Sequence, residues 1–147
     1  MSIHDETNVL RRIPLFAGLP DAKLKLLAFT CDRVTFAAGQ MLFAEGDEAD
    51  AAYVIITGEA EVTIASARGP ERINVMSAHS VVGEIGIICD VPRTATVRAT
   101  SALDTLRIGK DQFLKLLNEF PELAAPIMTV LGRRLAEQSV MRSKAGA

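Results

Sequence analysis

The residues whose types and spacing could do chemistry lie together in residues 82–97, VGEIGIICDVPRTATV. Glu84 stands between Gly83 and Gly86, and Arg93 precedes a short β-type run. The two glycines suit a tight turn into a short helical segment, whose free backbone N–H groups converge on one spot and attract an anion. An arginine beside such a turn can offer a planar fork of donors to two oxygens of one phosphate. The segment therefore predicts a site for a single phosphate-like anion.

The carboxylate of Glu84 restricts the kind of ligand that this site can bind. A carboxylate next to a phosphate is repelled by it, and a hydrogen bond from a hydroxyl group of the ligand to the carboxylate would offset that repulsion. A ribose 2′-OH supplies such a donor, small Ala95 leaves room for the ligand, and the Thr94 hydroxyl can reach a phosphate oxygen or the edge of a base. Four valines could line an apolar slot for the base: Val75, Val81, Val82 and Val97. The alternative is a structural salt bridge between Glu84 and Arg93, which the pair taken alone would favour.

The elements that must position these residues follow from hydrophobic periodicity. Residues 8–30 have a helical pattern broken by prolines, which predicts two short helices, the second beginning near Pro20 and Asp21. From residue 32 to 110 the period approaches two and turn residues recur, with a hairpin predicted at residues 53–64. Further strands fit residues 33–36, 41–44, 72–76, 95–100 and 103–108. Many short strands with spaced turns predict an antiparallel jelly-roll β-barrel.

The helical period returns after Gly109. Apolar residues in the range 113–117 predict one helix, and a last helix should begin near Pro121, with Pro126 kinking it. We therefore expect one mainly β domain over residues 1–147: N-terminal helices (1–30), a β-roll (31–109), and C-terminal helices with a tail (110–147).

The spacing within residues 83–97 resembles the phosphate-binding cassette of the cyclic nucleotide-binding domain. This domain occurs in catabolite-activator and Fnr-type bacterial regulators, in cyclic-nucleotide-dependent kinases and in cyclic-nucleotide-gated channels. Residues 38–40, 45–47 and 53–62 resemble the early strands and turns of the same family, and the resemblance covers about residues 13–139.

The resemblance implies that Glu84 takes the ribose 2′-OH, that Arg93 takes the exocyclic phosphate oxygens, and that backbone groups of Gly83 and Ile85 hold sugar and phosphate. It also implies that the last helix closes over the base as a lid, and Arg134 is the candidate contact on that helix, with exposed surface charge as its alternative. The expected ligand-binding residues are Val82, Gly83, Glu84, Ile85, Arg93, Thr94, Ala95 and Arg134.

The expected function is that of a cytoplasmic sensor, not an enzyme, that binds a 3′,5′-cyclic purine nucleotide without a further cofactor. In the family that the sequence resembles, a hydroxyl at the position of Thr94 is compatible with cyclic AMP and can favour cyclic GMP, and we favour cyclic AMP. Ligand should move residues 113–135 about a hinge at residues 118–126. We expect an unidentified protein effector, no membrane contact, and a monomer or homodimer.

Several function classes fit the sequence poorly. The net charge is −2 and the basic residues are scattered, which disfavours binding to a polyanion. Cys31 and Cys89, expected to be reduced and buried, are too few for an iron–sulfur cluster. No helix-turn-helix follows before Ala147, so we expect no direct DNA binding. The remaining alternatives are the sensory half of a Crp/Fnr-type regulator, a degenerate scaffold, or a cupin-like metal enzyme, for which only His79 lies in the folded body.

Overall fold

The computed structural model describes residues 3–123, 128–129, 132–133 and 136 of the chain. Two helices, α1 (Ile3–Arg11) and α2 (Asp21–Thr30), come first. The strands are β1 (Asp32–Phe36), β2 (Met41–Phe43), β3 (Ala51–Thr57), β4 (Ala60–Ile64), β5 (Glu71–Met76), β6 (Val81–Val82), β7 (Thr96–Ala99) and β8 (Leu103–Gly109). The short helix α3 (Glu84–Ile88) stands between β6 and β7, and α4 (Lys110–Glu119) and the 3-10 turn η1 (Pro121–Leu123) follow β8.

The strands form two four-stranded sheets with the orders β1-β8-β3-β6 and β2-β7-β4-β5. All of the pairings are antiparallel. Except for β4 and β5, which pair as a hairpin, consecutive strands alternate between the sheets, and the arrangement is the predicted jelly roll with flanking helices. The hairpin predicted at residues 53–64 is wrong, because β3 and β4 lie in different sheets and β3 pairs with β6 and β8.

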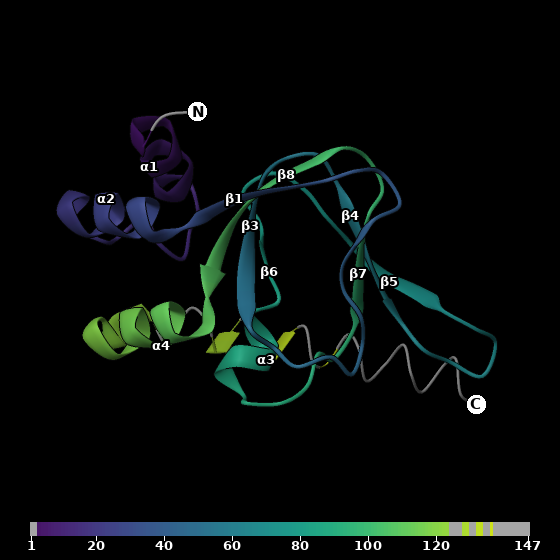
Figure 1. Cartoon of the computed structure of the whole chain (residues 1–147). Helices are drawn as coiled ribbons and strands as arrows, with labels where there is room; N and C mark the ends of the chain where they lie inside the picture. Colours follow the sequence, from purple (N-terminus) through teal and green to yellow (C-terminus); the bar gives the residue numbers. More distant parts are fainter. Residues whose placement is uncertain (1–2, 124–127, 130–131, 134–135, 137–147) are drawn as a thin grey trace.

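Two hydrophobic cores hold these layers. Figure 1 shows α1, α2 and α4 on one side of the molecule, the sheet with β4, β5 and β7 on the other, and α3 at one end of the roll. The helical-layer core joins α1, α2 and α4 to the outer face of the first sheet, through residues such as Phe16, Val54 and Phe113. The inter-sheet core fills the roll and includes Ile55, Val97 and Leu103. The site described below lies beside this second core.

Some boundaries differ from the prediction. α1 begins at Ile3 rather than at residue 8, because Asp5 and Glu6 occupy its first turn, where acidic side chains favour a helix N-terminus. Pro20 precedes α2 as predicted. The predicted last helix begins as η1, and residues 128–129, 132–133 and 136 are helical, whereas Pro126 and Arg134 lie outside the described residues.

Candidate functional site

The turn from β6 into α3 depends on a glycine. Gly83 has φ of 88°, in the left-handed region that side chains rarely adopt. A Cβ atom at this position would lie 2.6 Å from Nη1 of Arg93 and 3.0 Å from the ring of Phe43. Glycine therefore allows both the turn and the close approach of the arginine.

α3 packs closely on the loop before β3 through its own glycine. A Cβ atom on Gly86 would lie 2.5 Å from the Cβ of Ala49 and 3.1 Å from the carbonyl oxygen of Val91. The two glycines thus allow different close contacts: Gly83 allows the approach of Arg93, and Gly86 allows the packing of α3 against Ala49 and Val91.

The backbone of Arg93 is held by the loop that follows β2. The Arg93 N–H donates to the carbonyl of Asp47, and the Gly46 N–H donates to the carbonyl of Arg93, both at 2.8 Å. Gly46 and Asp47 therefore position the backbone of Arg93.

The guanidinium of Arg93 lies inside the protein. The residue is 3% exposed, and its Nη1 and Nη2 each donate at 2.7 Å, to the carbonyls of Gly83 and Ala51. Its charged plane stacks on the ring of Phe43, 3.9 Å from the ring centroid. These contacts fix the orientation of the donor fork.

The charge of Arg93 is incompletely balanced by these contacts. Burial lowers its pKa, although nearby Asp50 acts in the opposite direction. Asp50 forms an ion pair with Arg93 at 3.4 Å, but its side chain is 67% exposed and it also pairs with Arg107. The buried Nε of Arg93 has no hydrogen-bond partner within the described part of the chain. A buried cation with an unused donor is suited to receive an anion.

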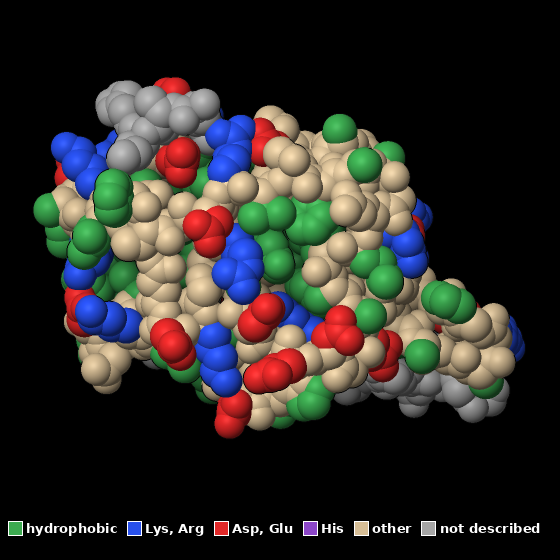
Figure 2. Space-filling model, viewed as in Figure 1, with side chains coloured by type: hydrophobic (Ala, Val, Ile, Leu, Met, Phe, Trp, Pro, Cys, Tyr) green, Lys and Arg blue, Asp and Glu red, His purple; other side chains and the backbone are tan. Residues whose placement is uncertain are grey.

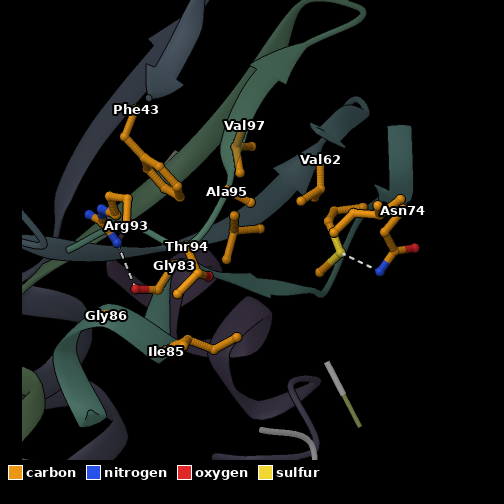
Figure 3. Close-up of a pocket in the computed structure, with 13 residues that line it drawn as sticks. Phe43, Val62, Asn74, Gly83, Ile85, Gly86, Arg93, Thr94, Ala95 and Val97 are labelled. Carbon is orange, nitrogen blue, oxygen red and sulfur yellow. Dashed lines mark hydrogen bonds between the residues drawn. The ribbon is translucent and has the colours of Figure 1, made fainter. Parts of the chain in front are cut away.

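A pocket opens beside this arginine, between the sheets and α3, and we call it the Arg93 pocket. Its lining residues are Phe43, Val62, Ile73, Asn74, Met76, Val82, Gly83, Ile85, Gly86, Arg93, Thr94, Ala95 and Val97. Figure 3 shows Arg93 and Phe43 at one end, Asn74 at the other, and apolar side chains between them. A ligand with one anionic end and a flat apolar body matches this order of groups.

The structure brings most of the predicted site residues together. Val82, Gly83, Ile85, Arg93, Thr94 and Ala95 line the Arg93 pocket. Glu84 is 5% exposed and lies in the first turn of α3, between two lining residues. Arg134 lies outside the described residues.

Two of the four valines predicted for the apolar slot do not contribute to it. Val82 and Val97 line the pocket, whereas Val81 packs in the helical-layer core and Val75 is 43% exposed. Neighbouring residues of a strand face opposite sides of the sheet, so Val81 and Val82 cannot both face the pocket. Phe43, Asn74 and Met76 were missed, because they come from strands whose facing was not assigned from the sequence. Val62 was expected to face inward, but its strand was not connected to the site from the sequence.

The cysteines also differ from expectation. Cys89 is exposed rather than buried. Cys31 is partly buried, and desolvation raises the pKa of its thiol to about 12. Both are free thiols.

The geometry can be compared with known proteins. Residues 33–120 match the model of the family described as the cyclic nucleotide-binding domain. This chain belongs to the cyclic nucleotide-binding domain family. The match includes all of the predicted site residues except Arg134, which lies C-terminal to it.

Two curated relatives of this cyclic nucleotide-binding domain are named as regulators. A cAMP-dependent protein kinase regulatory subunit of Emericella nidulans is 32% identical, over 74% of this chain and 26% of its own length. A CRP-like cAMP-activated global transcriptional regulator of Mycobacterium tuberculosis is 27% identical, over 86% of this chain and 57% of its own length. The chain thus spans about a quarter to somewhat over half of these relatives.

Solved structures agree with this family. The N-terminal domain of a transcriptional regulator from Streptomyces coelicolor has a TM-score of 0.69 at 35% identity, covering 88% of this chain and 93% of that one. The regulatory domain of Toxoplasma gondii PKA, crystallised with cAMP, has a TM-score of 0.73 at 25% identity, covering 77% and 43%.

Other kinds of site were sought in the described residues. They contain no helix both long and apolar enough to cross a bilayer, and no group of three or more potential metal ligands. On the face seen in Figure 2, Lys and Arg side chains are interspersed with Asp and Glu.

Proposed function

We propose that this domain is a cytoplasmic, non-enzymatic sensor that binds a 3′,5′-cyclic purine nucleotide in the Arg93 pocket, with cyclic AMP preferred to cyclic GMP. The observation that carries the proposal is the buried guanidinium of Arg93, which retains an unused Nε donor at the end of an apolar pocket. The preference for cyclic AMP is supported by the relatives, whose names include cAMP.

In this proposal the ligand lies along the pocket from Arg93 toward β5. Arg93 binds the exocyclic phosphate oxygens, and Glu84 accepts a hydrogen bond from the ribose 2′-OH. Val82 and Val97 flank the purine, with Ala95 leaving space for the sugar. The cyclic phosphate carries one negative charge, which balances the one buried guanidinium.

The proposed output is movement of the C-terminal helix, with residues 118–126 as the hinge and Arg134 as the contact to the base. Ligand must bind one helix position more tightly than the other for the domain to act as a switch. We further propose that the domain acts on an effector, either another domain of the same protein or a partner protein. The relatives that are named as regulators support this proposal.

Calorimetric titration with cyclic AMP and cyclic GMP tests this proposal. The wild type should bind at least one nucleotide, and Arg93→Ala should lose at least ~2 kcal/mol of binding free energy, because it removes one partner of a buried charged hydrogen bond. Arg93→Lys keeps the charge but not the fork, so it should also bind more weakly.

The matched control is Arg98→Ala. Arg98 is an exposed arginine of β7 that donates to the Gly39 carbonyl at 2.7 Å and is not among the residues lining the pocket. This variant should bind like the wild type. Absence of heat with either nucleotide at high concentration would contradict the proposal, as would equal affinity in folded Arg93→Lys and wild type.

A further inference from the structure

We propose that Arg107 raises the affinity of the Arg93 pocket for cyclic nucleotide, by sharing the carboxylate of Asp50 with Arg93. This inference rests on the proposed function and adds a positioning residue that lies outside the pocket. Arg107 stands near the end of β8 and is not among the residues lining the pocket. It would therefore act on the ligand through Asp50 and Arg93, and not by direct contact.

One carboxylate contacts two arginines at this place. Oδ1 of Asp50 lies 3.4 Å from Nη2 of Arg93, and Oδ2 of Asp50 lies 3.3 Å from Nη2 of Arg107. The three side chains differ in exposure, which is 1% for Arg93, 30% for Arg107 and 67% for Asp50. Each oxygen of the carboxylate thus serves a different arginine, one buried and one partly exposed.

Strand pairing holds these groups together. Asp50 immediately precedes β3, and Ala51, the first residue of that strand, pairs with Gly109 of β8. The carbonyl of Asp50 accepts the backbone N–H of Lys110, the first residue of α4, at 2.9 Å. Arg107 lies two residues before Gly109. The backbone therefore keeps Arg107 near Asp50, at the junction where β8 leads into α4.

A bound phosphate and the Asp50 carboxylate would be two anions on one guanidinium. Burial lowers the pKa of Arg93, and Asp50 opposes this effect more than the other neighbouring groups do. The carboxylate is therefore the main anion with which a phosphate would share Arg93, and the two anions would repel each other. Arg107 offsets part of the Asp50 charge and so reduces this repulsion. Loss of Arg107 should weaken binding although it removes no contact with the ligand.

Calorimetric titration of a double-mutant cycle with cyclic AMP tests this role. Arg107→Ala should bind about two- to fivefold more weakly than the wild type, the range for an exposed ion pair. In the Asp50→Asn background the same change should have no effect, because the charge that Arg107 offsets is gone. Arg107→Lys keeps a positive charge at this position and should bind more tightly than Arg107→Ala.

The matched control is Arg33→Ala, which removes one positive charge from β1 of the same sheet. Arg33 forms its ion pair with Asp104 and is not among the residues lining the pocket. This variant should bind cyclic AMP like the wild type, which shows that the loss in Arg107→Ala does not follow from net charge alone.

Three results would overturn the role of Arg107 and leave the proposed function standing. The first is equal affinity in Arg107→Ala and the wild type. The second is the same loss from Arg107→Ala in the wild-type and Asp50→Asn backgrounds, because Arg107 would then act without the carboxylate. The third is loss of binding in Asp50→Asn, because the carboxylate would then hold Arg93 in place instead of opposing the phosphate. Failure of the wild type to bind any cyclic nucleotide would overturn both proposals.

Discussion

Glu84 is the residue whose proposed role can be separated most cleanly from that of its neighbours. It is 5% exposed and lies in the first turn of α3. If its carboxylate accepts the ribose 2′-OH, Glu84→Gln should bind cyclic AMP about 1.5–3 kcal/mol more weakly, the range for a hydrogen bond to a charged group. Calorimetry with cyclic AMP and with 2′-deoxy cyclic AMP measures this loss.

The deoxy ligand is the control in this experiment. It lacks the hydroxyl, so the wild type should bind it weakly and Glu84→Gln should weaken it little further. A variant that loses the same affinity for both ligands would show that Glu84 acts on the fold of α3 and not on the ribose.

Among single residues, the sequence predicted those site residues that lie near one another along the chain. Residues 82–97 contain Gly83, Glu84 and Arg93, and their spacing predicted an anion site. The sequence could not predict that the guanidinium stacks on Phe43 or donates to the Ala51 carbonyl. Those contacts join segments that are distant in sequence, and only the closed roll brings them together.

Among the elements, α3 and α4 are the pair that could transmit occupancy. Ile87 of α3 packs in the same core as Phe113 and Leu116 of α4 and Leu123 of η1. A ligand that shifts α3 would therefore disturb the packing of α4 and η1, because close-packed side chains transmit displacement.

Hydrogen exchange tests this coupling. Saturating cyclic AMP should change the exchange rates of backbone amides in residues 118–126 several-fold, since the local opening free energy depends on packing that differs between the two states. Peptides from β1, whose residues pair with β8 and do not line the pocket, provide the internal control. Unchanged exchange across residues 118–126 would contradict the hinge.

The elements themselves were largely predictable, because alternating and helical periods are local signals. The predicted strand at residues 72–76 closely matches β5 (Glu71–Met76), and the predicted helix at residues 113–117 lies within α4. The sequence pattern did not reveal the two-residue β6 or the register shift opposite Ile73. Both depend on pairing with a partner strand, and the register shift is what brings Asn74 into the pocket.

For the molecule as a whole, β3 connects the two cores. Ala52 and Val54 pack in the helical-layer core, while Ile55 packs in the inter-sheet core. The Arg93 pocket is lined by residues of the inter-sheet core, such as Val82 and Met76, and by α3, whose Ile87 belongs to the other core. Neither core can be lost without exposing apolar side chains of the other, so the domain should unfold in one transition.

Ligand should shift that single transition. A nucleotide that binds only the folded state at 100 times its Kd adds about 2.7 kcal/mol to the free energy of unfolding, and a domain of this size should gain roughly 5–10 °C in Tm. Scanning calorimetry with cyclic AMP measures the shift. Linear 5′-AMP, which has the same base, and Arg93→Lys with cyclic AMP are the controls, and both should shift Tm much less. Two separate transitions, of which only one responds to ligand, would show that the helical layer and the roll unfold independently. In that case the packing between the two layers could not couple ligand in the Arg93 pocket to α4.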